Sequence, residues 1–283
     1  MSRSLVRIAA AGVLLTAAAF HGLAQTVRHY SHTVAVKPET VGFSSERLQR
    51  LHALIQDEID RKQLAGAVTI LARHGKVVDY CMYGVRDMAT AAPMTKDVIF
   101  RDYSMTKPVT GVAMMILYEQ GKWLPADPIA RYIPELAQLK VFKGVGTDGK
   151  IILADPEHAP TMQELMSHSA GFSYGSGHSV VDAMYQEQKV MQSANLQAMI
   201  DKLSKIPLNY EPGKGWTYSL SMDIEGYIVE KLSRQTLPDF MRQQIFAPLD
   251  MKDTGFFVPE EKHVRFANNY RDNPRGSAGC DGQ

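Results

Sequence analysis

The stretch Phe100-Arg-Asp-Tyr-Ser104-Met-Thr-Lys107-Pro-Val-Thr110 opens an apolar run with helical spacing and places Ser104 and Lys107 three residues apart. On a helix this spacing brings both side chains to one face. A serine needs a neighbouring base to become a nucleophile, and a lysine can be that base only if its pKa is lowered. The stretch therefore predicts acyl transfer through a serine ester. The backbone N–H of Ser104 is the candidate oxyanion donor at the helix start.

Composition and charge exclude several classes of protein. The 283 residues carry a net charge of +1 and no basic stripe, so we expect no nucleic-acid partner. The histidines show no metal-ligand spacing, and the only cysteines are Cys81 and Cys280. Cys81 lies in a strand-like run and is interpreted as a small buried hydrophobe. We expect no metal, and the sequence leaves open whether the two cysteines pair.

The first residues have the pattern of a signal peptide. Arg3 and Arg7 precede an apolar segment, residues 8–20, that is too short to span a bilayer comfortably. Small residues up to Ala24 suit a signal peptidase, so residues 1–24 are predicted to be removed, with an uncleaved anchor as the alternative. We expect an exported, periplasmic or secreted protein without stable membrane insertion after cleavage.

The rest of the chain predicts an α/β (α+β) protein, an antiparallel sheet flanked by helices plus a mostly helical subdomain. Expected elements are a helix from Ser44 or Ser45 to about residue 63, a hairpin of residues 67–83 turning at His74-Gly75, and a helix from Ser104 to about Gln120. Residues 144–160 are predicted to be loop. The expected organisation is a tail (25–42), an α/β domain (43–122 and 213–283) and the helical subdomain (123–212).

Two further residues are candidates for the chemistry. Tyr218 follows a Pro-Gly turn and precedes a helix pattern, so it can project into a cleft and exchange protons with a lysine. Ser173 lies in Gly171-Phe-Ser-Tyr-Gly175, which matches the nucleophile elbow Gly-x-Ser-x-Gly. That elbow needs a strand before the serine and a helix directly after it, whereas here a helix pattern precedes and a Gly-rich loop follows. Ser104 is therefore the preferred nucleophile.

Five segments, in order within residues 40–257, carry a resemblance to a known family. They are Phe100–Thr110, Asp127-Pro-x-x-x-Tyr132-x-Pro134-Glu, Leu165-Met-Ser-His168-Ser-Ala-Gly171, Pro212-Gly-x-x-Trp-x-Tyr218-Ser, and Ile245-Phe-x-Pro248-Leu-x-Met251-x-x-Thr254. Together they resemble the serine β-lactamase-related family: class C β-lactamases, D-alanyl-D-alanine carboxypeptidases and family VIII carboxylesterases, with the esterase branch nearest.

The resemblance implies a β-lactamase/transpeptidase-like fold and specific roles. Ser104 matches the acylated serine, Lys107 the lysine that shares its proton, and Tyr218 the proposed general base. His168 matches a structural position. The resemblance implies no metal, no organic cofactor and a small-molecule substrate, an ester or a β-lactam or peptide. We expect an exported serine hydrolase, a carboxylesterase on short-chain acyl esters; the oligomeric state is not predicted.

Two departures from the family pattern bear on substrate and activity. Leu220 stands where β-lactamases carry an asparagine that binds the substrate amide, which favours esters. A β-lactamase or a D-Ala-D-Ala carboxypeptidase stays an alternative.

The second departure is a missing motif: the sequence shows no Lys-Thr-Gly, His-Thr-Gly or Trp-x-Gly after Tyr218. We therefore expect an incomplete sheet and a half-built oxyanion hole, which typically costs about two or three orders of magnitude in rate. A truncated, weakly active or non-catalytic binding fragment is the last alternative.

Overall fold

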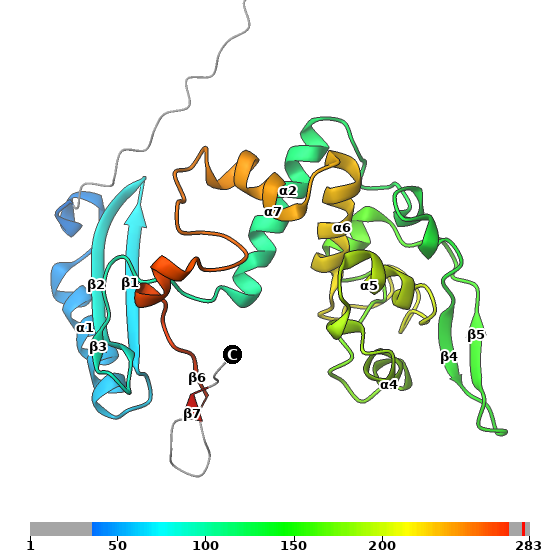
Figure 1. Ribbon diagram of the computed structural model, residues 1–283, viewed down its shortest axis with the longest axis horizontal. Coiled ribbons are helices and arrows are strands. Elements are labelled where there is room, and N and C mark those ends of the chain that lie inside the picture. Colours follow the sequence, from blue (N-terminus) through cyan, green and yellow to red (C-terminus); the bar gives the residue numbers. More distant parts are fainter. Residues whose placement is uncertain (1–35, 272–278, 281–283) are drawn as a thin grey trace, which may run out of the picture.

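The computed structural model describes residues 36–271 and 279–280, so the predicted signal peptide lies outside the described residues. Figure 1 shows a lobe with a small sheet on one side and a helical lobe on the other, with α2 (Thr106–Glu119) between them. This mixture of helices and short antiparallel sheets agrees with the predicted α/β (α+β) class.

The sheet lobe begins with two helical segments, η1 (Pro38–Val41) and α1 (Ser45–Asp60). Ser44 caps α1 by accepting the backbone N–H of Arg47, which confirms the predicted helix start. The backbone N–H of Val36 donates to a strand residue of the sheet, so the described part of the predicted tail contacts the lobe.

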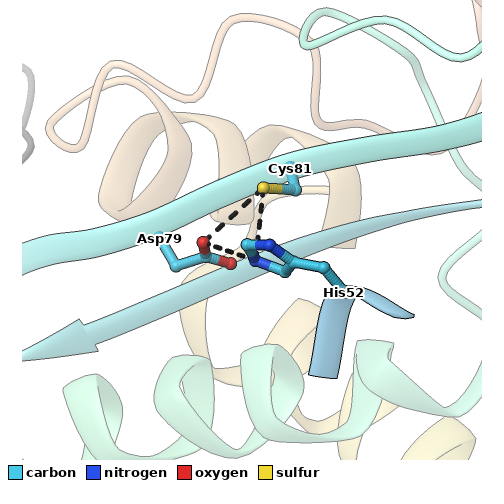
Figure 2. Close-up of side chains that lie close together, drawn as sticks. All are labelled: His52, Asp79 and Cys81. Carbon is cyan, nitrogen blue, oxygen red and sulfur yellow. Dashed lines mark hydrogen bonds and ion pairs between the residues drawn. The ribbon is translucent and has the colours of Figure 1, made fainter. Parts of the chain in front are cut away.

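The sheet has the order β1-β2-β3, with every pair antiparallel. Its strands are β1 (Gly66–Arg73), β2 (Lys76–Asp87) and β3 (Ala92–Pro93). His74 and Gly75 join β1 to β2 with positive φ angles of 53° and 70°, the conformation that a tight hairpin turn requires. The predicted hairpin is confirmed. Helix α1 packs against β2, and His52 of α1 points toward β2 (Figure 2).

A late segment of the chain returns to this lobe. Ile99 pairs in parallel with Phe266, and the backbone N–H of Asn268 donates to the carbonyl of Arg86. Two short strands follow, β6 (Tyr270–Arg271) and β7 (Gly279–Cys280), which pair with each other. The sequence showed no strand pattern at this position, so β7 corrects that expectation.

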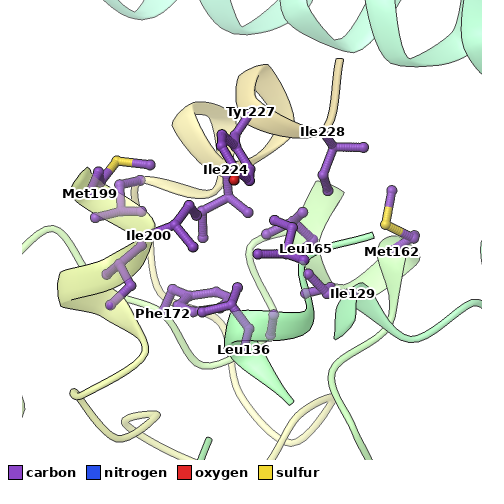
Figure 3. Packing of buried hydrophobic residues seen from close by; sticks show 14 of the residues in the cluster. Ile129, Leu136, Met162, Leu165, Phe172, Met199, Ile200, Ile224, Tyr227 and Ile228 are labelled. Carbon is purple, nitrogen blue, oxygen red and sulfur yellow. The ribbon is translucent and has the colours of Figure 1, made fainter. Parts of the chain in front are cut away.

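The helical lobe is built around α2 and α6 (Ser221–Ser233), which pack against each other. Its other elements are η3 (Ile129–Arg131), η4 (Pro134–Leu136), α3 (Met162–Met166), α4 (Val180–Glu187), η5 (Val190–Gln192), α5 (Leu196–Leu203), α7 (Leu237–Met241) and the π-helical η6 (Arg242–Phe246). The short 3₁₀ helix η7 (Glu260–Arg265) lies instead beside the sheet lobe (Figure 1). Figure 3 shows apolar side chains of the helical lobe meeting in one buried cluster, among them Leu165, Phe172, Ile200, Ile224 and Ile228.

Residues 144–160 correct another expectation. Part of this stretch, predicted to be loop, belongs to a second hairpin of β4 (Val141–Val145) and β5 (Ile151–Ala154). The sequence signal was the short apolar run of β5 beside the turn residues Asp148-Gly149, but the many polar and turn residues of the stretch obscured it. Ile152 and Leu153 are about half exposed because the hairpin projects from the lobe (Figure 1).

None of the helices in the described part of the chain combines the length and the apolar character that crossing a membrane requires.

Candidate active site

Ser104 lies in a single 3₁₀ turn, η2 (Tyr103–Met105), which leads directly into α2. The α-helix therefore begins at Thr106, two residues later than the sequence suggested. Tyr103 has a φ of +44°, in the left-handed region that a bulky residue rarely adopts. Backbone strain of this kind is typical of functional sites, and here it lies directly before the candidate nucleophile. Ser104 is exposed.

Two side chains converge on the Ser104 hydroxyl. The Tyr218 hydroxyl donates a hydrogen bond to Ser104 Oγ at 2.6 Å. Lys107 Nζ lies 3.4 Å from the same oxygen and 4.4 Å from the centre of the Tyr218 ring. The structure thus brings together the serine, lysine and tyrosine predicted from the sequence. The hydroxyl of Ser173 is hydrogen-bonded to Asp182 and Gly175 and not to this group.

The pKa values of Lys107 and Tyr218 are displaced in opposite directions. Burial lowers the pKa of Lys107, but hydrogen bonding with Tyr218 and Tyr174 outweighs it, and the pKa is raised overall. The pKa of Tyr218 is lowered, first by hydrogen bonding with Lys107 and then by the Ser104 hydroxyl. A protonated lysine beside a tyrosine that ionises more easily is the pattern of a tyrosine base. A lysine that acts as the base would need a pKa below its usual value, whereas the pKa of Lys107 is raised.

Tyr174 is a site residue that sequence reasoning missed. Its hydroxyl lies 3.1 Å from Lys107 Nζ, and its ring lies 5.4 Å from the Tyr218 ring. Both tyrosines therefore contact the Lys107 ammonium group, Tyr174 through its hydroxyl and Tyr218 through its ring. The signal was in Gly171-Phe-Ser-Tyr-Gly175, which the sequence analysis considered only for its serine.

Ser173 itself is arranged as a structural residue. It is 3% exposed, and its hydroxyl donates to the Asp182 carboxylate while accepting the backbone N–H of Gly175 at 3.0 Å. The Tyr185 hydroxyl accepts the backbone N–H of Ser173 at 3.2 Å. A buried hydroxyl committed to these partners is not accessible to an ester, so the geometry supports the choice of Ser104 over Ser173.

Two neighbouring loops hold both tyrosines in place. Backbone N–H groups of Asn209 and Thr217 donate to the carbonyls of Gly171 and His168, at 2.8 and 3.1 Å. Gly171 has a φ of +92°, and a Cβ there would lie 2.7 Å from the carbonyl oxygen of Tyr210. Only glycine fits this close approach, which aligns the loop of Tyr174 with the loop of Tyr218.

His168 supports the Tyr218 loop. Its Nδ1 accepts the backbone N–H of Ser219 at 3.3 Å, and its ring lies 5.1 Å from the Tyr218 ring. Burial, and then the charge of Lys107, lower the pKa of the imidazole. A neutral imidazole held against the loop fits the structural position expected for His168.

The surface around Ser104 is apolar and aromatic. Tyr103, Met105, Trp216 and Tyr218 are all exposed, with Trp216 at 66%. Leu220, by contrast, is fully buried. Its side chain is a hydrocarbon and offers no hydrogen-bonding group to a substrate. A cavity of about 350 Å³ lies elsewhere, between α7 and residues 252–262, and none of the Ser104 group lines it.

The chain has helices around short antiparallel strands, and a serine and a lysine at the start of a central helix meet a tyrosine from a facing loop. This arrangement is that of the β-lactamase/transpeptidase-like fold. The chain belongs to the Beta-lactamase family, whose model matches residues 51–283.

Relatives and solved structures agree with this assignment. Protein Rv1367c of Mycobacterium tuberculosis (strain ATCC 25618 / H37Rv) is 33% identical over 221 residues, which cover 77% of this chain and 54% of that protein. Esterase EstB of Burkholderia gladioli is 32% identical over 228 residues, 79% of this chain and 54% of the relative. The chain thus spans about half the length of the curated relatives it matches. The structure of EstCE1, a hydrolase with promiscuous acyltransferase activity, has a TM-score of 0.70 at 25% identity, covering 82% of this chain and 58% of that one.

Proposed function

We propose that the protein is an exported serine hydrolase that cleaves short-chain acyl esters through an acyl-enzyme on Ser104. The observation that carries the proposal is the 2.6 Å hydrogen bond between the hydroxyls of Tyr218 and Ser104, with Lys107 beside both. Membership of the Beta-lactamase family and the likeness to Esterase EstB support the reaction class.

Acylation follows from the contacts of Tyr218. Its phenolate form, stabilised by the Lys107 ammonium, accepts the proton of Ser104 as Oγ bonds to the ester carbonyl carbon. The resulting oxyanion accepts the backbone N–H of Ser104. When the tetrahedral intermediate collapses, the bond to the alcohol oxygen breaks and Tyr218 returns its proton to the departing alcohol.

Deacylation uses the same groups with water as the attacking molecule. Tyr218 accepts a proton from water, the hydroxide oxygen bonds to the acyl carbon, and the bond to Ser104 Oγ breaks. Ser104 recovers its proton from Tyr218, and the carboxylic acid leaves. Lys107 keeps its positive charge throughout, in line with its raised pKa.

The residue at position 220 favours esters over β-lactams and peptides. A β-lactam side-chain amide needs a hydrogen-bond partner in the site, and a polar ligand group left without one binds weakly. Leu220 is buried and apolar, while the exposed Trp216 and Met105 offer apolar surface to an acyl chain. A β-lactamase and a D-Ala-D-Ala carboxypeptidase are therefore the second-ranked functions.

The test compares three substrates on the purified chain: p-nitrophenyl butyrate, a chromogenic cephalosporin and a D-Ala-D-Ala peptide. We expect ester turnover to exceed the other two and to be lost in Ser104→Ala but kept in Ser173→Ala. Mass spectrometry after an activated ester should locate the acyl group on Ser104. Faster cephalosporin turnover would overturn the ester preference, and a folded chain without an adduct on Ser104 would support a non-catalytic binding protein.

Export rests on the sequence of residues 1–24 alone. N-terminal sequencing of the protein recovered from the periplasm or medium of an expressing bacterium should begin after Ala24. Protein that keeps Met1 and stays in the cytosol would contradict this part of the proposal.

A further inference from the structure

A second group of reactive side chains lies in the sheet lobe, between α1 and β2. His52 of α1 faces Asp79 and Cys81 of β2, and their nitrogen, oxygen and sulfur atoms all lie within 4.8 Å of one another (Figure 2). Asp79 and Cys81 are two residues apart on one strand, so both side chains point to the same face of the sheet. None of the three takes part in the chemistry proposed at Ser104.

The distances suit a shared metal ion. His52 Nε2 lies 2.8 Å from Asp79 Oδ1, while Cys81 Sγ lies 3.6 Å from that nitrogen and 3.5 Å from that oxygen. Tetrahedral zinc holds its ligands at about 2.0–2.3 Å, which puts neighbouring ligand atoms about 3.3–3.8 Å apart. The two sulfur distances already match, and the nitrogen–oxygen pair needs to open by about 0.5 Å.

The arrangement is unlike a proton relay. In a relay the two ring nitrogens of a histidine face different partners, one toward the nucleophile and one toward the carboxylate. Here the same nitrogen, Nε2, faces both the thiol and the carboxylate. Three possible ligand atoms that lie within 4.8 Å of one another can contact a single ion.

Asp79 supplies an independent observation. Its side chain is 8% exposed, and its second oxygen, Oδ2, is buried without a hydrogen-bond partner among the described residues. A buried carboxylate oxygen without a partner is costly, and such an atom in a native structure needs an explanation such as a bound ion. The His52 side chain is 31% exposed, which leaves a route for an ion from solvent.

We propose that His52, Asp79 and Cys81 bind one Zn²⁺ ion that ties α1 to the β1-β2 hairpin. Imidazole nitrogen, thiolate and carboxylate are all zinc ligands, and a set of three leaves a fourth position for water. On binding, the Cys81 thiol loses its proton to solvent and a sulfur–zinc bond forms. This site revises the sequence-based expectation of no metal, which rested on the absence of a local ligand motif.

The test is a metal titration of the full 283-residue chain after treatment with a chelator. We expect one Zn²⁺ per chain by native mass spectrometry and a higher melting temperature. With Co²⁺ as the probe we expect a thiolate-to-metal charge-transfer band. His52→Ala, Asp79→Asn and Cys81→Ser should each lose stoichiometric binding, and Cys81→Ser should also lose the band.

Two control variants change residues of the same types, a cysteine and a histidine, that lie outside the group of His52, Asp79 and Cys81. Cys280→Ser removes the other cysteine, and His158→Ala breaks a histidine–carboxylate pair with Glu164 that has the same 2.8 Å distance but no thiol. Both should keep one Zn²⁺. Binding that survives Cys81→Ser, binding lost in Cys280→Ser, or wild-type protein that takes up no stoichiometric Zn²⁺ would overturn the proposal.

A measurement on the unaltered chain guards against variants that fail to fold. Zn²⁺ should slow alkylation of Cys81 by iodoacetamide, located by peptide mass spectrometry, and leave the rate at Cys280 unchanged. Equal alkylation of Cys81 with and without Zn²⁺ would contradict a thiolate ligand.

Discussion

Tyr218 and Ser104 are 114 positions apart in the sequence, and their hydroxyl oxygens lie 2.6 Å apart in the structure. The loop of residues 209–220 and the turn before α2 are brought together by the packing of α2 against α6, the helix that follows Tyr218. Hydrogen bonding with Lys107 first, and then with Ser104, lowers the pKa of Tyr218, so its hydroxyl ionises more easily than that of an ordinary tyrosine. Tyr218 is the group best placed to take the Ser104 proton.

Tyr218→Phe tests that role. The ring and its contacts with His168 and Trp216 stay, but the proton acceptor is lost, so kcat/KM for p-nitrophenyl butyrate should fall about 10²–10⁴-fold. The melting temperature should change little because Tyr218 is 43% exposed. Tyr118→Phe, at an exposed tyrosine of α2, is the matched control and should keep full activity. Activity retained in Tyr218→Phe would assign the base to another group.

Tyr174→Phe tests the support of Lys107. Removing the hydroxyl removes the 3.1 Å hydrogen bond to Nζ, and water replaces it only in part, so we expect about a tenfold loss in kcat/KM. Tyr174 raises the pKa of Lys107, so its loss should lower that pKa. The alkaline limb of the pH–rate profile should therefore move to lower pH. A profile that keeps its alkaline limb would show that Tyr174 acts only through packing.

Ser173→Ala separates the competing serine from the proposed catalytic group around Ser104. The change removes a hydrogen bond to the buried Asp182 carboxylate, so the free energy of unfolding should fall by about 1–3 kcal/mol. Esterase activity at temperatures well below melting should stay near that of the wild type. Urea denaturation measures the first effect, with the exposed Ser167→Ala as control. Loss of activity in folded Ser173→Ala protein would reopen the choice of nucleophile.

How much of the site could be predicted depended on how far apart its residues lie in the sequence. The pairing of Ser104 with Lys107 follows from helical spacing, which is a local property. Nothing local places Tyr218 beside Ser104, and only the resemblance of its segment to a known family suggested that contact. Tyr174 was missed because its position follows from the left-handed turn at Gly171 and the backbone pairing of two loops, which no periodicity encodes.

The same reasoning explains the fold and the proposed metal cluster. The hairpin at His74-Gly75 was predictable because a turn signal stood between two clear strand patterns. Alternation along β2 places Asp79 and Cys81 on one face, but His52 joins them only through the way α1 lies on the sheet. Contacts between elements depend on packing, so the pattern within each element could not reveal the cluster.

Glu225 of α6 gives a prediction about stability and pH. It is 1% exposed, and neither carboxylate oxygen has a hydrogen-bond partner among the described residues. Burial, and then the charge of Asp223, raise its pKa from 4.5 to about 8, although Lys107 acts in the opposite direction. Between pH 4.5 and about 8, Glu225 is therefore protonated in the folded chain and ionised in the unfolded chain.

The sign of the pH dependence follows from this difference in bound protons. Between pH 4.5 and about 8 the unfolded chain binds fewer protons at Glu225, so its contribution to stability falls as the pH rises. Glu225→Gln keeps the shape of the side chain but cannot ionise. The free energy of unfolding of this variant should therefore decrease less between about pH 5 and pH 9 than that of the wild type, and the difference between the two decreases should be roughly 3–5 kcal/mol at most. Urea denaturation at both pH values measures the difference, with the exposed Glu260→Gln as control. Parallel pH dependence in wild type and Glu225→Gln would show that Glu225 is ionised in the folded chain, with Lys107 as the charge that compensates it.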